Sequence, residues 1–195
     1  MNMKYSNKTY EDILNWLDTN LTQDRYIHTL GTVDTAVMLA ERFGLDVDKA
    51  RIGALLHDCA KCFSADKLRQ ILNDTNIVIE DSELVNYKTL HAPVSAFIAE
   101  NDFGVTDPEI LSSIRWHTLG RVKMSDLEKV VFLADKIEGK TRDEDYRAQI
   151  LQILDTQGID KAMLECMRTT IKSLIDRNLK ICNQTIDVYN RFLDA

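Results

Sequence analysis

Glycine and proline are scarce in this chain: its 195 residues include seven glycines and two prolines. Few turns are therefore expected, and the sequence has no flexible linker, internal repeat or low-complexity tract. It also lacks any run of eighteen apolar residues, so no membrane-spanning helix is predicted. The N-terminal stretch MNMKYSNKTYEDILNW has no apolar core of the kind found in signal peptides, and we expect a cytoplasmic location.

Cysteine is also infrequent, with four residues at Cys59, Cys62, Cys166 and Cys182. The first two have the spacing of a metal-binding or redox pair. However, no second pair completes a zinc site, and no βαβ pattern surrounds them. We interpret all four as reduced thiols, and a redox pair is the alternative.

The chain has no excess of positive charge. Its 31 acidic residues outnumber 24 basic ones, which gives a formal net charge of −7 and an isoelectric point of about 5.1. This balance argues against general binding to nucleic acid or to an anionic membrane, because either would require a basic face. An anionic small molecule is still an acceptable partner if positive charge is concentrated locally, and a homodimer is left open.

The length and composition indicate one domain with a full core, since 45% of the residues are hydrophobic and 28% are charged. Hydrophobic periodicity is helical almost throughout. For example, Leu30, Val33 and Val37 recur at steps of three and four along one face. The stretch NIVIED (76–81) is the one β-like run, and we expect it to be a loop. The predicted fold class is all-α, as a compact helical bundle.

Local signals place several helix boundaries. These are a C-terminal stop at Gly44, a helix over 48–59, an N-cap at Ser64, an N-cap and first position at Asp107-Pro108, and a capping box from Ser125 to Glu128. The pattern over 159–193 predicts one long helix or two in series. Few turn signals interrupt these segments, which supports the all-α prediction.

The four histidines, His28, His57, His91 and His117, each lie within a predicted helix or at its end. Successive histidines are separated by roughly one helical hairpin. In a helical bundle, such spacing can bring one side chain from each of four helices to a common point.

Two apolar helical runs end on a carboxylate. GALLHDCAKCF (53–63) changes abruptly at His57-Asp58, and VVFLADKIEG changes at Asp135. A carboxylate drawn inward in this way requires a partner or a metal ion, and imidazoles with carboxylates are ligands for Zn, Mn or Fe. The spacing alone leaves two interpretations open, a metal site or separate histidines at the surface or satisfied within the structure.

The order His28, His57-Asp58, Asp135 is the signature of HD-domain metal phosphohydrolases. The stretches RYIHTLGTVDTAVMLAERFGLDVDKARIGALLHDCAK (25–61) and LHAPVSAFIAENDFGVTDPEILSSIRWHTLGRVKMSDLEKVVFLADKIE (90–138) resemble the YqeK family. These are bacterial enzymes that hydrolyse diadenosine tetraphosphate symmetrically to two ADP. The resemblance covers about residues 10–190.

The resemblance implies a single HD-type domain over 1–195, with an HD core at about 22–138 and C-terminal helices at about 143–194 packed on it. It also implies one or two metal ions, iron first, with Mn, Co or Zn as substitutes. The implied ligands are His28, His57, Asp58 and Asp135. By the same resemblance, His91 and His117 face the phosphates and could hold a second ion.

Further roles follow from the family motifs. The implied catalytic residues are Asp58, Lys61, His91 and His117, and the implied substrate-binding residues are Lys61, His91, His117, Thr118, Gly120, Arg121 and Arg142. Where the family usually has Pro-x-Arg after Ile137-Glu138, this chain reads Gly139-Lys140-Thr141-Arg142, so Arg142 lies one position later. Simpler roles are a helix-terminal charge for Lys61 and surface charges for Arg121 and Arg142.

The implied activity is therefore metal-dependent hydrolysis of a nucleotide, with diadenosine tetraphosphate as the first candidate. Alternatives are an HD hydrolase of a mononucleotide, a guanosine polyphosphate or a cyclic dinucleotide, a diiron HD-type oxygenase, and a non-catalytic nucleotide sensor. A small-molecule nucleotide is the expected partner, rather than nucleic acid or membrane.

Overall fold

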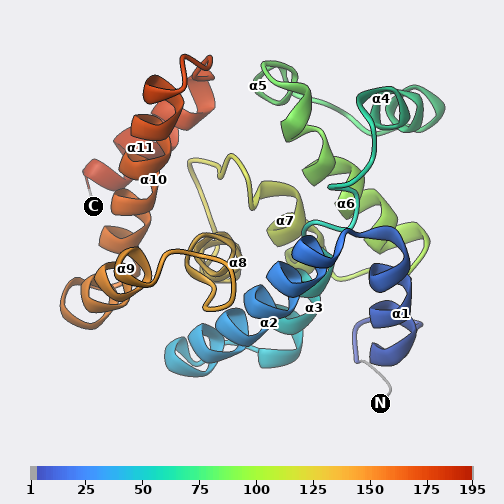
Figure 1. Cartoon of the computed structure of the whole chain (residues 1–195), viewed down its shortest axis with the longest axis horizontal. Helices are drawn as coiled ribbons and strands as arrows, with labels where there is room; N and C mark the ends of the chain where they lie inside the picture. The colour runs from blue at the N-terminus through green and yellow to red at the C-terminus, as the bar shows by residue number, and fades with distance from the viewer. Residues whose placement is uncertain (1–3, 195) are drawn as a thin grey trace.

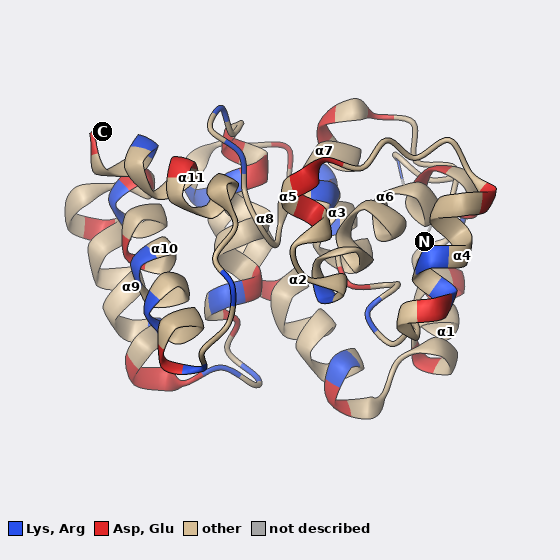
Figure 2. Cartoon of the chain, turned by 90° about the horizontal axis from the view of Figure 1, so that it is seen from above, with Lys and Arg blue, Asp and Glu red and all other residues tan. Residues whose placement is uncertain are grey.

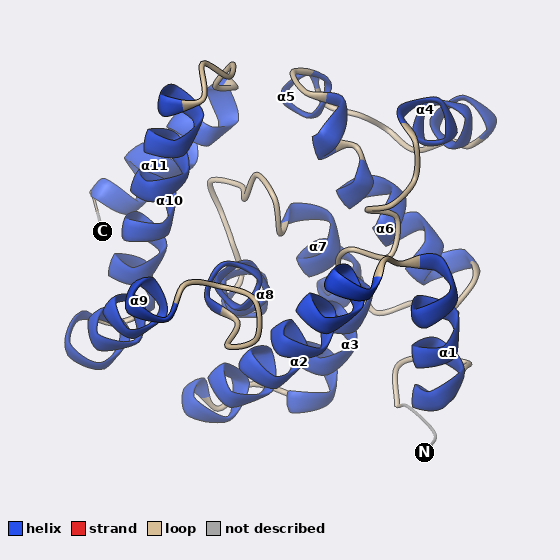
Figure 3. Cartoon of the chain, viewed as in Figure 1, coloured by secondary structure: helices blue, strands red, loops and turns tan. Residues whose placement is uncertain are grey.

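The computed structural model describes residues 4–194, which form helices joined by loops, with no β-strand among them (Figure 3). The all-α prediction is therefore confirmed. The β-like stretch is a loop over 76–80, as expected, and Asp81 begins a short helix.

The helices follow one another with short connections. In chain order they are α1 (Tyr10–Asn20), α2 (Gln23–Phe43), α3 (Val47–Leu56), α4 (Ala65–Asp74), α5 (Asp81–Leu84), the 3-10 helix η1 (Tyr87–Thr89), α6 (His91–Asn101), α7 (Pro108–Trp116), α8 (Asp126–Ile137), α9 (Glu144–Gln157), α10 (Ile159–Asp176) and α11 (Asn183–Leu193).

Helix α8 lies in the middle of the molecule (Figure 1). It packs against α2, α3 and α7 on one side and against α10 on the other, and it also contacts α9. Five successive residues of α8 have no exposed surface: Val130, Val131, Phe132, Leu133 and Ala134. A helix that is apolar all round is expected where neighbours cover all its faces, and α8 therefore forms the centre of the core.

Helix boundaries agree with the local signals. Gly44 ends α2 in the left-handed conformation, with φ of 67°. The Asp107 side chain accepts from the backbone N–H groups that follow Pro108, and Ser125 forms the predicted capping box with Glu128. Ser64 caps α4 through the N–H of Lys67.

Two segments refine the prediction. The pattern over 159–193 forms two helices, α10 and α11, separated by residues 177–182. The helix predicted over 48–59 ends earlier, at Leu56, with His57 as its C-cap. The chain then turns because the Cys59 N–H donates to the Leu56 carbonyl and the Ala60 N–H donates to the Ser95 hydroxyl.

The four cysteines are free thiols, as interpreted from the sequence, and Cys62 is the exposed one. Lys and Arg are interspersed with Asp and Glu along the chain (Figure 2). None of the described helices combines the length and the apolar character needed to cross a membrane.

Candidate metal centre

Three of the four histidines lie at helix ends. His57 and His117 are the C-caps of α3 and α7, and His91 is the first residue of α6. Nδ1 of each ring faces a backbone carbonyl three residues earlier: Ala54 at 2.6 Å, Ile114 at 2.7 Å and Lys88 at 2.5 Å, respectively. A carbonyl can only accept, so each Nδ1 carries the proton and donates it. Each Nε2 is therefore left with a lone pair.

His28, from the second turn of α2, has a side-chain partner instead. Its Nδ1 lies 3.2 Å from Oε1 of Glu138, which has no exposed surface. The Glu138 carboxylate also accepts the N–H groups of Lys140 and Thr141, at 2.6 and 2.9 Å, and the Thr141 hydroxyl. Burial works to raise the pKa of Glu138, but these donors together outweigh it, so the pKa is below its ordinary value. The carboxylate is charged and holds the Nδ1 proton of His28.

Space for this carboxylate depends on Gly31, one turn after His28. A Cβ atom at Gly31 would lie 2.1 Å from Oε2 of Glu138. Glycine inside a helix is less favourable than alanine by about 1 kcal/mol. In this helix it leaves the room that Glu138 occupies beside α2.

The free ring nitrogens converge on Asp58. Two groups of potential ligand atoms form, His28 with His57 and Asp58, and Asp58 with His91 and His117, and within each group the atoms lie no more than 4.8 Å apart. All five side chains are buried. Asp58 belongs to both groups, so it could contribute a ligand atom to an ion held by either one.

The contacts inside these groups suit a cation. Nε2 of His28 lies 3.0 Å from Oδ1 of Asp135, and Oδ1 of Asp58 lies 3.0 Å from Nε2 of His91. Because each of these rings carries its proton on Nδ1, its Nε2 has no hydrogen to donate. In each contact, the Nε2 lone pair therefore faces a lone pair of the carboxylate oxygen. Accordingly, Nε2 of His28, Nε2 of His57 and Oδ1 of Asp58 are buried and have no hydrogen-bond partner among residues 4–194. A divalent ion held by these atoms would remove the conflict.

Electrostatics keep these groups in the forms that bind metals. Burial lowers the pKa of His57 to about 3 and that of His91 to about 4, so both rings are neutral at pH 7. Burial works to raise the pKa of Asp58, but interactions with its neighbours, the Lys61 ammonium among them, hold it well below its usual value. Burial also works to raise the pKa of Asp135, but the charge of Lys136 and other neighbours outweigh it, so the pKa of Asp135 is also well below its usual value. Both carboxylates are therefore ionised.

Asp135 lies at the edge of the first group. Its Oδ1 is 3.0 Å from Nε2 of His28 and 4.0 Å from Nε2 of His57. The same oxygen is 2.8 Å from Nη2 of Arg142, and Oδ2 is 2.8 Å from Nζ of Lys136. The structure thus brings Asp135 to the predicted ligands, with two cations beside it.

Lys61 and Thr118 contact the second group. Nζ of Lys61 lies 3.0 Å from Nε2 of His91 and 3.3 Å from Oδ1 of Asp58. The Thr118 hydroxyl lies 3.0 Å from Nε2 of His117. These two side chains therefore lie against the ring nitrogens of the second group.

Arg121 and Gly120 lie elsewhere. The Arg121 guanidinium pairs with the buried carboxylate of Glu128, with Nε to Oε2 at 3.1 Å and Nη2 to Oε1 at 2.7 Å. Glu128 is at the N-terminal end of α8, whereas Asp135 is near its C-terminal end. Gly120 has φ of 69°, and its carbonyl accepts from Gln184. Within residues 4–194, neither residue contacts the histidine cluster.

Sequence reasoning missed two side chains at the cluster. Glu138 follows Ile137 in the sequence, but nothing in the sequence showed that its side chain points into the protein. The signal that could have indicated this was Gly31, because a glycine inside a helix leaves room for a neighbouring side chain. Arg25, three residues before His28, lies with Nη1 3.4 Å from Oδ2 of Asp58, and no pattern in the sequence pointed to it.

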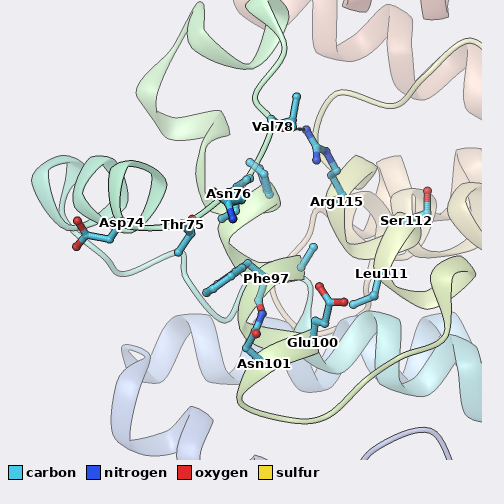
Figure 4. Close-up of a pocket in the computed structure, with 13 residues that line it drawn as sticks. Asp74, Thr75, Asn76, Val78, Phe97, Glu100, Asn101, Leu111, Ser112 and Arg115 are labelled. Carbon is cyan, nitrogen blue, oxygen red and sulfur yellow. Dashed lines mark hydrogen bonds between the residues drawn. The ribbon is translucent and has the colours of Figure 1, made fainter.

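A cavity of about 710 Å³ lies away from these residues (Figure 4). It is formed by the α4–α5 connection, α6 and α7, with Phe97 and Leu111 among its apolar residues. Its one cation, Arg115, is already bound to the Val78 carbonyl and the Glu83 carboxylate. No member of the histidine cluster lines it, so we assign it no part in the chemistry.

Comparison with known proteins connects this geometry to characterised families. A family model for the HD domain matches residues 25–140. The chain is 35% identical to a symmetrical bis(5'-nucleosyl)-tetraphosphatase of Bacillus subtilis, over 92% of this chain and 95% of the relative. A Staphylococcus aureus protein of the same name is also 35% identical, over 88% of each chain. The crystal structure of an HD superfamily hydrolase from Clostridium acetobutylicum, described as involved in NAD metabolism, matches with a TM-score of 0.89 and 34% identity, over 96% of this chain and 98% of that one.

Proposed function

This chain belongs to the HD-domain family and, within it, to the family of the symmetrical bis(5'-nucleosyl)-tetraphosphatases, and we propose that it hydrolyses diadenosine tetraphosphate symmetrically to two ADP in a metal-dependent reaction. The observation that carries the proposal is the buried Asp58 shared by two groups of potential metal ligands. It occurs in a chain that aligns along nearly its full length with tetraphosphatases.

We propose His28, His57, Asp58 and Asp135 as ligands of one ion, and Asp58, His91 and His117 as ligands of a second. Among the described residues, Nε2 of His28, Nε2 of His57 and Oδ1 of Asp58 are buried without a hydrogen-bond partner, which supports the assignment. Iron is the proposed ion, with Mn, Co or Zn as substitutes, because imidazoles and carboxylates suit all four. When bound, such ions supply Lewis-acid chemistry, which activates water and withdraws charge from a phosphoryl oxygen.

The protein groups around this site bind and orient the substrate. Lys61 and Thr118 lie beside the second group and would donate to phosphoryl oxygens, and Arg142 lies beside Asp135. Charge-assisted hydrogen bonds from such cations offset the charge that develops in phosphoryl transfer. Carbonyl and carboxylate partners at Nδ1 keep the four imidazoles oriented throughout.

The proposed cleavage occurs at the central bridge of the symmetrical tetraphosphate chain. Attack at the bridge between the two middle phosphates divides it into two equal halves, each an ADP. Attack one bridge away would give ATP and AMP. The names of the relatives favour the first outcome, and also favour this substrate over the other nucleotides, the oxygenase and the sensor that the sequence left open. The cytoplasmic location, the lack of nucleic-acid or membrane partners and the domain boundaries stay predictions.

The decisive experiment incubates the purified protein with diadenosine tetraphosphate and iron, manganese or cobalt, and separates the nucleotides by anion-exchange chromatography. We expect ADP as the only nucleotide product. ATP together with AMP, or no turnover with any of the three metals, would overturn the proposal.

Asp58→Ala tests whether the cluster carries the activity. We expect loss of bound metal and of turnover together, with the helical circular dichroism retained, because the apolar side chains that pack around α8 are unchanged. Asp66→Ala is the matched control, since that side chain is 96% exposed on α4 and pairs with the exposed Arg69. Full metal content and activity in Asp58→Ala would contradict the assignment.

A further inference from the structure

A second cavity, of about 560 Å³, lies directly beside the cluster. It is formed by the first turn of α2 and by residues 140–142 of the turn that leaves α8, and His28 belongs both to its wall and to the metal-ligand group. The cavity and the metal-ligand group therefore share His28. The volume is within the range of small-molecule sites in proteins.

Positive charge is concentrated around this cavity. Arg25, Lys140 and Arg142 line it, against one carboxylate, Asp24. The whole chain has a formal net charge of −7, so this local excess runs against the overall balance. A pocket with such an excess attracts anions in spite of the acidic surface elsewhere.

The two arginines connect the cavity to the carboxylates of the cluster. Arg25 Nη1 lies 3.4 Å from Asp58, and Arg142 donates to Asp135 from both Nε and Nη2. A guanidinium has five N–H donors, and these contacts use one donor of Arg25 and two of Arg142. Both side chains are more than one-third exposed. Each can therefore bind an anion in the cavity while keeping its carboxylate contact.

Lys140 is positioned by the turn itself. Its backbone N–H donates to Glu138, which fixes the main chain at the cavity wall. Its ammonium pairs with Asp34 at 2.8 Å, but the side chains are 41% and 69% exposed. Exposed pairs of this kind contribute about 0–1 kcal/mol, so the ammonium can turn to a phosphate at little cost. Lys140 also lies in the four-residue segment where the chain departs from the Pro-x-Arg pattern.

The lining favours phosphate over a nucleobase. Among the described residues no aromatic side chain lines the cavity, and Ile27 is its one aliphatic contributor. A base would need an aromatic or broad apolar surface to stack on, whereas the hydroxyls of Thr22 and Thr141 add hydrogen-bonding groups suited to phosphate oxygens.

Building on the proposed function, we propose that this cavity is a subsite for the phosphate chain on one side of the cleaved bridge. Arg25 and Lys140 are its binding residues, beside Arg142. The subsite would hold the diphosphate of one ADP half while the next phosphate is at the cluster. It recognises phosphates and is indifferent to the base.

Lys140→Met tests this with little risk to folding, because the side chain is exposed and keeps its length. Lys172→Met, which removes the same charge from an exposed position on α10, is the control. We expect the KM for diadenosine tetraphosphate to rise about tenfold in Lys140→Met, because a charge-assisted hydrogen bond to a phosphate oxygen is lost. The kcat and the metal content should stay near wild type. The control should not change.

Calorimetric titration of the metal-loaded protein with ADP and with inorganic pyrophosphate separates this subsite from the proposed activity. Both ligands should bind Lys140→Met, and likewise Arg25→Gln, about tenfold more weakly than wild type. This result supports the subsite even if the dinucleotide is not hydrolysed. Unchanged binding in both variants would overturn the subsite while leaving the hydrolase intact. Weakened binding of ADP alone would also overturn it, because the nucleoside would then be the group recognised.

Discussion

Replacing Glu138 by glutamine would change the proton on His28 while preserving the shape of the side chain. Oε1 of the carboxylate now accepts from His28 Nδ1, and Oε2 accepts from the N–H groups of Lys140 and, at 3.2 Å, of Thr141. Glutamine has one oxygen and one NH₂ group, and it cannot accept from both sides. If its oxygen stays with the two backbone donors, its NH₂ group faces His28 and requires Nδ1 to accept. The ring proton then moves to Nε2, toward the cluster.

The expected loss follows from this exchange of tautomers. A protonated Nε2 cannot bind a metal ion, so binding must first restore the other tautomer against an unfavourable contact. Loss of a partner that orients a ligating histidine typically weakens metal affinity 10–100-fold, which corresponds to about 1.4–2.7 kcal/mol. We expect Glu138→Gln to fall in this range.

The measurement is titration of metal-free protein with Mn²⁺ in competition with a chelator. Glu128→Gln is a matched control, because Glu128 is another fully buried carboxylate, and its partners are Arg121, Ser112 and the Ser125 N–H, none of them at the cluster. We expect both variants to lose stability, and we expect the metal affinity to fall only in Glu138→Gln. Wild-type affinity in Glu138→Gln, or equal losses in both, would refute the reasoning.

Three further changes test other parts of the structure. Gly31→Ala should lower both the midpoint of thermal unfolding and the metal affinity, because the added Cβ atom would lie 2.1 Å from Oε2 of Glu138. Alanine is more favourable than glycine in a helix by about 1 kcal/mol, so an unfolding midpoint at or above that of the wild type would contradict this clash. His91→Ala should lose the second of the two proposed ions, measured by elemental analysis of purified protein, because one potential ligand of the second group is removed. An unchanged ratio of metal to protein would restrict this residue to phosphate binding. Tyr5→Phe should cost about 1 kcal/mol at pH 7, because the Tyr5 hydroxyl donates to Asp46 at 2.7 Å and helps to lower its pKa from 3.8 to about 2. A carboxyl with a depressed pKa stabilises the fold at pH values above its unfolded pKa, and this effect is lost as the pH falls through its folded pKa. The free energies of urea unfolding of variant and wild type should therefore converge as the pH falls through about 2, and a constant difference would count against the hydrogen bond.

Much of the fold could be predicted because its signals are local. The Asp107-Pro108 start and the Ser125–Glu128 capping box involve atoms within one turn of each other, so sequence spacing determines them. The early end of α3 could not be predicted in this way. It depends on Ser95, from α6, which accepts the Ala60 N–H.

The candidate site shows the same division. Sequence spacing and the family resemblance predicted that His28, His57 and Asp58 lie close together, and the structure places them within one group of potential metal ligands. The ion-pair partners of charged side chains could not be predicted from spacing or from the family resemblance. Arg121 could meet a substrate or a carboxylate, and only the folded arrangement of α8 places Glu128 beside it. The partner of a long charged side chain depends on which residues the fold places near it, and a sequence motif does not contain that information.

The backbone carbonyls that hold three of the imidazoles have a consequence for how the sequence can drift over time. Every residue type supplies a carbonyl, so changes at position 88, for instance, leave the acceptor for His91 in place. His28 differs because its acceptor is the side chain of Glu138, which in turn needs glycine at position 31. In a library of random variants, selection for metal binding should therefore tolerate nearly any residue at 88 and almost none at 31 or 138.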